Sequence, residues 1–207
     1  VLFYGRLARA LGSDVTVYGV QSPGVMDAPV TARDSLDSVE ALAHYYLGCV
    51  RRVQPNGPLT LVGASFGGML AFEMAREAAD TSDGHRVLMI DTPGTNQLPA
   101  ELADDAAILE YCFGDDLDLN AATLRALPGL DAQLDLVARR SGVTRAEDVA
   151  TTRARLSRFV AEFRRNSQAM ETYQPSPLHG TSVRVTYCAA SELREGDPAG
   201  GSDAWRT

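Results

Sequence analysis

The sequence predicts an α/β protein with a mostly parallel sheet and helices on both faces of that sheet, and two observations carry this prediction. Short apolar runs alternate with segments of helical spacing between residues 37 and 90. In addition, the runs at 59–63 and 86–90 are separated by one segment of helix length. Neighbouring parallel strands need a crossover of this length, whereas antiparallel strands are often joined by a tight turn.

The expected elements follow one another in a regular order. The run VTVYGV at 15–20 is rich in β-branched residues and predicts a strand. The segment 37–53 has helical spacing, an acidic start and a basic end, and predicts a helix. The remaining elements before and after the long middle region are a turn at 54–58, a strand at 59–63, a helix at 66–79, a turn at 80–84, a strand at 86–90 and a strand at 182–190.

The middle of the chain has a different character. From Thr95 to Thr172 helical patterns occur at 101–113, 130–139 and 145–170, with no convincing strand among them. We therefore expect one domain of 207 residues whose sheet is interrupted by a helical insertion over 95–172.

Composition excludes several classes of function. The net charge is −8, so a nucleic acid partner is not expected. All 19 basic residues are arginine, which excludes a phosphate-loop lysine and a Schiff-base lysine. No apolar run approaches the roughly 20 residues of a membrane span, so we expect a cytoplasmic protein without a membrane partner. The three cysteines are far apart and predict buried free thiols, with neither a disulfide framework nor a metal site.

The pattern Gly63-Ala64-Ser65-Phe66-Gly67 carries the chemistry, since it matches G-x-S-x-G between an apolar strand and a helix. Ser65 is the candidate nucleophile at the helix N-terminus, and the backbone N–H of Phe66 is the candidate oxyanion donor. A side chain at Gly63 or Gly67 would collide with the neighbouring strand or helix. The alternative is a glycine-rich packing turn with no catalytic role.

A serine nucleophile needs a base and an orienting acid. Asp91 ends the strand at 86–90, which brings it to the same carboxyl edge of the sheet as Ser65. Asp91 could instead cap the turn DTPG. Glu192 and Asp197 follow the strand at 182–190 and remain alternates for the acid.

The base is harder to place, because the chain has three histidines and none of them suits the role. His44 lies within the predicted helix 37–53, which favours a helix-surface or core position. His85 and His179 each precede a strand, so we expect both at the amino edge of the sheet.

The segments around these residues resemble the thioesterase domains of nonribosomal peptide synthetases and polyketide synthases, especially the former. The likeness includes GPLTLVGASFGGMLAFEMA, FYGRLARALG, VYGVQSPG, ALAHYYLGCVRRVQPNGP, VLMIDTPG and ETYQPSPLHGTSVRVTYCAASE. It covers nearly the whole chain apart from the helical insertion. Ala64 and Phe66 favour the chain-terminating type over editing thioesterases that act in trans, whose motif usually has histidine before the serine and methionine after it.

The resemblance implies an α/β-hydrolase fold and an acyl-enzyme mechanism. A peptidyl or acyl chain would arrive as a thioester on the phosphopantetheine arm of an upstream carrier domain, so no further cofactor is expected. Ser65 would accept the chain and release it by hydrolysis or cyclisation. The resemblance strengthens Asp91 as the acid over Glu192, and it makes the insertion over 95–172 a lid. Apolar residues of that lid would line an acyl channel or pack its core, among them Ile108, Leu109, Phe113, Phe159 and Phe163.

Two parts of the family pattern are expected outside the chain. A first strand and a glycine-containing loop with a second oxyanion donor would precede Val1. The catalytic histidine would follow Thr207, past a tryptophan that resembles Trp205. Two alternative functions remain open at this point: a stand-alone editing (type II) thioesterase or small-acyl esterase, and a non-catalytic α/β-hydrolase-like binding module.

Overall fold

The fold is seen in a computed structural model of the chain. The structure describes residues 4–25, 36–79, 84–94, 102, 104–178, 182–189 and 205.

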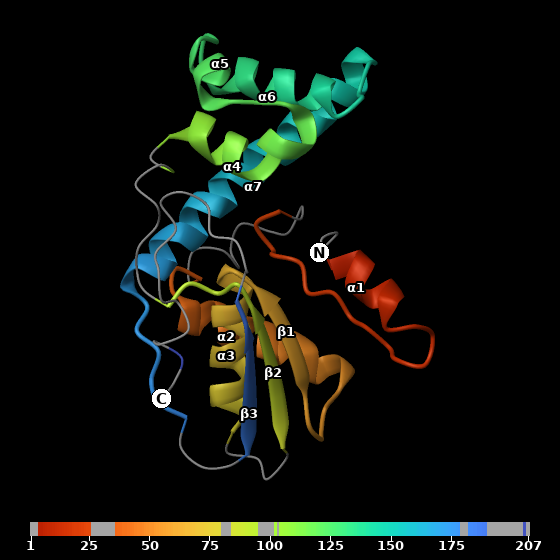
Figure 1. The fold of residues 1–207 in the computed structure, drawn as a ribbon, viewed down its shortest axis with the longest axis vertical. Helices are drawn as coiled ribbons and strands as arrows, with labels where there is room; N and C mark the ends of the chain where they lie inside the picture. Colours follow the sequence, from red (N-terminus) through yellow and green to blue (C-terminus); the bar gives the residue numbers. More distant parts are fainter. Residues whose placement is uncertain are drawn as a thin grey trace.

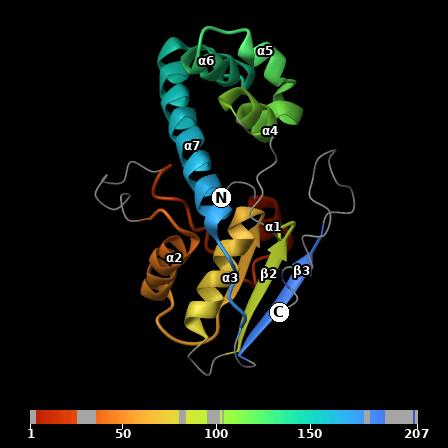
Figure 2. The ribbon, with the colours of Figure 1, turned by 90° about the vertical axis from the view of Figure 1, so that its left-hand side faces the viewer.

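A parallel sheet lies at the centre of the fold. Its three strands, β1 (Thr60–Ala64), β2 (His85–Ile90) and β3 (Val183–Cys188), lie side by side in that order. The register pairs Ala64 with Ile90 and Ile90 with Cys188, so the three strands end together. Their carboxyl ends point toward the helices formed by the middle of the chain (Figures 1 and 2). The predicted strands at 59–63, 86–90 and 182–190 are therefore confirmed within a residue or two.

Helices cover one face of this sheet in the described residues. Helix α3 (Phe66–Ala78) packs against the strands, and α2 (Val39–Val53) lies on the far side of α3 (Figure 2). This arrangement differs from the prediction of helices on both faces. The apolar stripe of α2, which includes Leu42 and Tyr46, is used against α3 instead of against the sheet.

No described helix covers the opposite face of the sheet, where Leu88 and Ile90 are half-buried. This face also carries Arg86 on β2 and Arg184 and Cys188 on β3, all of which are exposed.

The cysteines are free, as expected, but the prediction that they are buried is wrong: Cys49 and Cys112 are half-buried and Cys188 is exposed. The error at Cys188 follows from the prediction that a helix would cover the face of the sheet that carries this residue.

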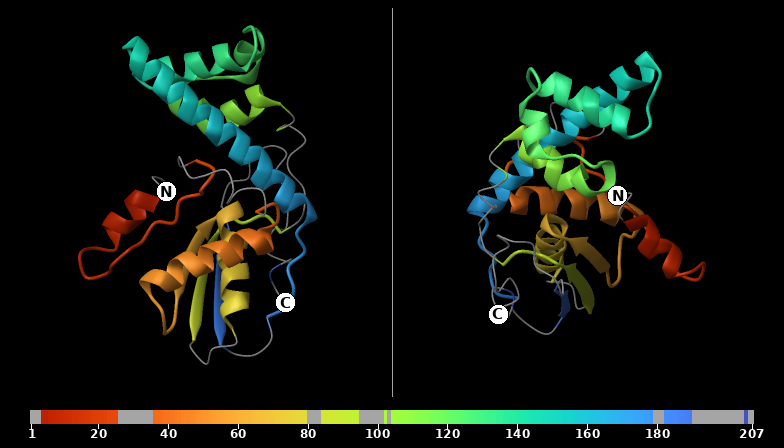
Figure 3. Two further views of the ribbon diagram at one scale, coloured as in Figure 1. Left: turned by 180° about the vertical axis from the view of Figure 1, so that it is seen from behind. Right: turned by 45° about the horizontal axis from the view of Figure 1, so that its top comes forward.

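The segment 15–20 does not form the strand that its β-branched residues predict. It follows helix α1 (Gly5–Ala10), and both lie beyond the β1 side of the sheet (Figures 1 and 3). Val15 is 49% exposed and Tyr18 69% exposed, and no ladder pairs the segment with a described strand. A strand exists only where a neighbour accepts its backbone hydrogen bonds, and β propensity alone does not supply that neighbour.

The middle of the chain forms the predicted helices. We name residues 104–172 the helical insertion; it contains α4 (Asp105–Leu117), α5 (Ala121–Arg125), α6 (Leu130–Arg140) and α7 (Ala146–Thr172). The short helix α5 was not predicted. These helices bury a core of their own, which consists of Ala106, Leu109, Leu119, Ala121, Leu124, Leu134, Val137 and Val160.

Helix α7 connects the insertion to the rest of the fold, which we name the α/β body: α2, α3 and the three strands. Val160 of α7 belongs to the core of the insertion, whereas Met170 belongs to the core that α3 forms with the sheet. Between them the buried Glu162 accepts a hydrogen bond from the Ser22 hydroxyl. A Cβ atom at Gly24 would meet the end of this side chain, so the carboxylate lies directly against the Gly24 backbone.

No helix in the described residues is long and apolar enough to cross a membrane.

Candidate active site

Ser65 lies in the connection from β1 to α3, which we name the serine turn (Gly63–Gly68). Its φ of 49° is in the left-handed region that residues other than glycine rarely adopt. Its side chain is exposed. A Cβ atom at Gly63 would lie less than 3.0 Å from the backbone of Gly67 and Gly68, closer than real Cβ contacts. The turn is therefore as tight as the sequence pattern requires.

A second position with no room for a side chain is Gly68, one residue after the G-x-S-x-G motif. A Cβ atom at Gly67 would meet only the Tyr4 hydroxyl, at 3.2 Å, so the predicted collision with a strand or helix at Gly67 is wrong. The close approach is at Gly68 instead, where a Cβ atom would lie less than 3.0 Å from the Thr92 hydroxyl. Gly63 and Gly68 thus let the serine turn pack tightly on itself and on the loop after β2.

The start of α3 supplies hydrogen-bond donors beside Ser65. The first N–H groups of a helix have no acceptor within the helix, and Phe66 is the first residue of α3. The side chain of Ser65 makes no cap hydrogen bond to this helix. The serine hydroxyl is therefore not used to stabilise its own helix, and the Phe66 N–H lies next to it in the chain.

Asp91 follows β2 directly and lies on the strand next to Ser65. The register pairs Ala64 with Ile90, so Ser65 and Asp91 are the next residues on two neighbouring strands, and the Ser65 N–H donates to the Ile90 carbonyl at 2.9 Å. Asp91 is exposed and has a φ of 47°, again in the left-handed region. The two candidate residues thus meet at one edge, each in an unusual backbone conformation.

Two tyrosine hydroxyls contact the backbone beside these residues, and sequence reasoning missed both. The Ala64 N–H donates to the Tyr4 hydroxyl at 2.8 Å. The Tyr187 hydroxyl donates to the Thr92 carbonyl at 2.8 Å. Burial, and then the negative charge of Asp91, raises the pKa of Tyr187. Both tyrosines lie in segments that resemble the thioesterase family, but the G-x-S-x-G motif contains neither, and only their contacts show where the hydroxyls are directed.

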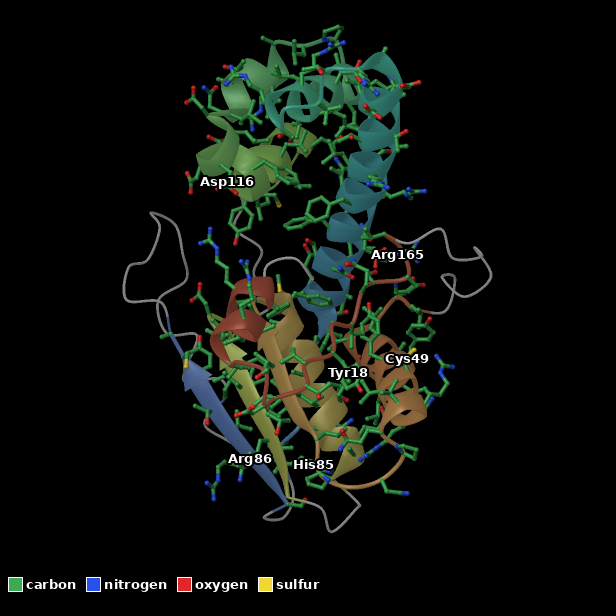
Figure 4. The ribbon with its side chains drawn as sticks, turned by 90° about the vertical axis from the view of Figure 1, so that its right-hand side faces the viewer. Tyr18, Cys49, His85, Arg86, Asp116 and Arg165 are labelled. Carbon is green, nitrogen blue, oxygen red and sulfur yellow. The ribbon has the colours of Figure 1, made fainter. Side chains whose placement is uncertain are left out.

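The two histidines that the structure describes lie away from this edge. His44 is on the surface of α2, where its Nδ1 lies 2.6 Å from a carboxylate oxygen of Glu77. His85 begins β2 and is buried; it accepts from the Leu59 N–H at 3.0 Å, and its other ring nitrogen is 3.1 Å from the Ala78 carbonyl. Figure 4 shows His85 at the end of the sheet opposite the helical insertion. The predictions for both histidines are confirmed.

Several predicted residues lie outside the described part of the chain. Neither the alternate acids Glu192 and Asp197 nor His179 can be placed. The tryptophan of the family pattern is described: Trp205 is buried against Phe72 of α3, with ring centroids 5.0 Å apart. Within the described residues, no group of three or more His, Cys, Asp or Glu side chains is arranged to hold a metal ion.

The proposed channel residues of the insertion separate into two groups. Leu109 is 0% exposed and belongs to the core of the insertion, which favours the core alternative for this residue, whereas Ile108 is buried without belonging to that core. Phe113, Phe159 and Phe163 are partly exposed and form a row, of which Phe113 and Phe159 also pack against the core of the insertion. The ring centroids of Phe113 and Phe159 are 5.5 Å apart, and those of Phe159 and Phe163 are 6.3 Å apart.

The fold and the site together define a class of protein: an α/β protein with a candidate serine nucleophile at the carboxyl edge of a parallel sheet. The family model described as a thioesterase domain matches residues 1–207. The chain therefore belongs to the thioesterase domain family, whose members are hydrolases that act on thioesters.

The similar proteins are much longer than this chain, and the chain matches a small part of each. The conidial pigment polyketide synthase alb1 of Aspergillus fumigatus is 39% identical over 98 residues, which are 45% of this chain and 4% of that protein. The polyketide synthase PksR of Bacillus subtilis is 39% identical over 79 residues, 37% of this chain and 3% of PksR. Malpinin synthetase of Mortierella alpina is 38% identical over 90 residues, 42% of this chain and 1% of that protein. The matched part is thus a small fraction of each relative.

Proposed function

We propose that this chain is the product-releasing thioesterase domain of a polyketide synthase or nonribosomal peptide synthetase, with an α/β-hydrolase fold. The observation that carries the proposal is Ser65, which combines a left-handed φ at a strand-to-helix turn with a neighbour in register, Asp91, on the next strand. Two of the similar proteins are named polyketide synthases and one a synthetase, which supports this setting.

The chemistry proceeds in two steps. The Ser65 hydroxyl oxygen attacks the carbonyl carbon of an acyl thioester on the phosphopantetheine arm of a carrier domain. A C–O bond forms, the C–S bond breaks, and the thiol leaves with a proton. Water, or a hydroxyl or amine of the acyl chain, then attacks the ester, so that a linear acid or a ring leaves and the serine hydroxyl is restored.

The remaining roles belong to an acid, a base and oxyanion donors. Asp91 orients a histidine that takes the proton of Ser65 and passes it to the departing sulfur. We propose that this histidine comes from beyond Thr207, since His85 lies at the end of the sheet opposite the helical insertion and His44 is on the surface of α2, beside Glu77. His179 lies outside the described residues. The Phe66 N–H donates to the oxyanion in both steps, together with a donor from before Val1.

The helical insertion is proposed as the lid. The row formed by Phe113, Phe159 and Phe163 is apolar and only partly buried, which supports a surface that contacts the acyl chain. The insertion connects to the α/β body next to the strand ends (Figures 1 and 2), the same edge that carries Ser65.

A labelling experiment tests the proposal in the protein with its natural flanking sequence. A fluorophosphonate probe is expected to modify Ser65, and an acyl N-acetylcysteamine thioester is expected to give an acyl-enzyme detected by intact mass. Ser65→Ala should abolish both, while Ser157→Ala on the exposed surface of α7 should change neither. Equal turnover of Ser65→Ala and the wild type would overturn the proposal.

The same assay separates the alternatives. A product-releasing domain prefers the long chain of its own upstream carrier domain, whereas an editing thioesterase or small-acyl esterase releases short acyl groups from unrelated carriers. A binding module forms no acyl-enzyme with any thioester. Comparing Asp91→Asn with Glu192→Gln identifies the acid, because loss of the triad acid lowers kcat by about 10³-fold or more.

A further inference from the structure

The two proposed catalytic residues hold their backbone in conformations that need support from their surroundings. Ser65 and Asp91 have φ values of 49° and 47°. Such conformations are unfavourable for residues with a side chain and persist only where neighbouring contacts fix them. The contacts that fix each turn therefore decide how well the reacting groups are aligned.

Tyr4 contacts the serine turn on both sides of Ser65. The N–H of Ser65 is directed at β2, where it donates to Ile90. Because successive N–H groups of a strand point to opposite edges, the N–H of Ala64 is directed away from β2, and there it donates to the Tyr4 hydroxyl at 2.8 Å. The same hydroxyl would lie 3.2 Å from a Cβ atom at Gly67. One oxygen atom thus lies against Ala64, directly before the serine, and beside Gly67, two residues after it.

Tyr4 reaches the serine turn from a short helix that is itself on the surface. Tyr4 is the N-cap residue of α1, a helix of six residues none of which is buried. The tyrosine therefore does not extend from α1 into a core formed by that helix. Its hydroxyl is instead directed to the serine turn, 60 residues further along the chain.

Tyr187 makes the equivalent contact at the turn after β2. Its hydroxyl donates to the carbonyl of Thr92, the residue that follows Asp91, at 2.8 Å. Thr92 is fully buried, and its side chain packs where a Cβ atom of Gly68 would otherwise lie. Tyr187 thus fixes a residue that contacts both the proposed acid and the helix of the proposed nucleophile.

The phenol of Tyr187 is suited to donate this hydrogen bond at every pH at which the enzyme is assayed. Burial and the charge of Asp91 raise the pKa of its phenol, so the hydroxyl keeps its proton over the whole range in which the enzyme is assayed.

We propose that Tyr4 and Tyr187 are positioning residues. They hold the serine turn and the turn after β2, which contains Asp91 and Thr92, in the conformations that align Ser65 and Asp91. This inference rests on the proposed function. Each residue acts through the backbone next to a reacting group and touches no substrate. Removing either hydroxyl should lower the rate of acyl transfer without weakening substrate binding.

The test compares three tyrosine-to-phenylalanine variants of the protein with its natural flanking sequence. Tyr4→Phe and Tyr187→Phe remove the two proposed positioning hydroxyls. Tyr173→Phe is the matched control, since its hydroxyl donates to Glu73 at 3.0 Å in the buried core, away from both turns. Each variant keeps its ring, so the packing is little changed. Active-site titration with the fluorophosphonate probe gives the fraction of folded, competent enzyme.

The readout is kcat per titrated site, with KM and Tm measured beside it. We expect Tyr4→Phe and Tyr187→Phe each to lower kcat per site by about 10-fold or more, with KM within about twofold of the wild type. Tyr173→Phe should lower Tm and leave kcat per site within about twofold.

The outcomes separate the two proposals. If the probe labels wild-type Ser65 but all three variants keep the wild-type kcat per site, the positioning role is wrong and the proposed function stands. If the probe does not label wild-type Ser65, the proposed function is wrong and the inference fails with it.

Discussion

The α/β body and the helical insertion differ in where their backbone departs from ordinary conformations. In the body, Ser65 and Asp91 have left-handed φ values at the ends of strands. In the insertion, Asp118 has φ and ψ of 52° where α4 ends, which is a common way for a helix to stop. Asp118 and Asp91 are of a residue type that adopts the left-handed region more often than most, whereas Ser65 is not, and its conformation is the one that a G-x-S-x-G turn between strand and helix requires.

The helix starts do not separate the two regions in the same way. Side-chain caps occur in both regions: α4 and α5 of the insertion begin with Asp104 and Asn120, and α2 of the body begins with Ser38, and each of these side chains accepts a hydrogen bond from the backbone of the first turn. In the body, α3 begins with Ser65, whose side chain makes no such bond. The Ser65 hydroxyl is therefore not used as a helix cap. The following predictions test the two regions separately.

The largest effect is expected in the serine turn. Gly63→Ala places a Cβ atom against the backbone of Gly67 and Gly68, which must shift. We expect a loss of about 3 kcal/mol of unfolding free energy, measured by urea denaturation, together with loss of probe labelling. The control is Gly48→Ala in α2, where the added methyl meets nothing within 4 Å. It should stabilise the protein by about 0.5 to 1 kcal/mol. Equal midpoints for the two variants would show that the turn is not tight.

A matched pair of leucine variants tests whether the two cores are separate. Leu134 in the insertion and Leu42 in the body are 0% and 1% exposed, and truncation of either to alanine costs about 2 to 5 kcal/mol. We expect Leu134→Ala to open residues 104–172 to limited proteolysis while Ser65 still reacts with a small probe. Leu42→Ala should reduce that labelling. Equal loss of labelling in the two variants would contradict separate cores.

A smaller effect is expected at the start of α4. Asp104 accepts from the Ala107 N–H at 2.8 Å and pairs with Arg125 at 2.7 Å. Removing this cap in Asp104→Ala should destabilise α4 by about 1 kcal/mol near neutral pH, measured by hydrogen exchange of its amides. Asp116→Ala, an exposed change later in α4, should stay within about 0.5 kcal/mol of the wild type.

The effect of Asp104 depends on pH in a defined direction. The hydrogen bond from Arg125, and then that from the Ala107 N–H, lowers the pKa of Asp104. Its contribution is therefore complete above the unfolded pKa of about 3.9 and is lost as the pH falls through the lower folded value. The difference between wild type and Asp104→Ala should shrink toward about pH 2.5. A constant difference would assign it to packing instead of to the carboxylate.

Much of the fold could be predicted because its signals are local. The apolar runs of β1 and β2 and the crossover between them indicated a parallel pair, and this pair brings Ser65 and Asp91 to one edge. The segment 15–20 has an equally strong β pattern but no described partner, and whether a partner exists is not a property of the segment. The same limit applies to the prediction of helices on both faces, because the apolar stripe of α2 packs against α3 and a helical pattern does not show which element covers it.

The sequence predicted only those site residues that directly follow an apolar strand. Ser65 and Asp91 follow apolar strands and were found by position. Tyr4 and Tyr187 act through contacts that span 60 and 95 residues, and a tyrosine in a helix start or a strand gives no sign of what its hydroxyl reaches. Gly68 is likewise needed because Thr92, on another loop, lies against it, and a helical pattern does not reveal that neighbour.

Helix α7 has a mechanical consequence for the molecule. It contains 27 residues and is therefore about 40 Å long. Its lower end is embedded in the body through Met170, and Val160 joins it to the core of the insertion. Such a rod acts as a lever: a tilt of about 5° at its base displaces the far end by about 3 Å. The Glu162–Ser22 hydrogen bond and the Arg165–Asp37 ion pair also join this helix to residues outside the insertion, so several contacts along its lower half oppose such a tilt.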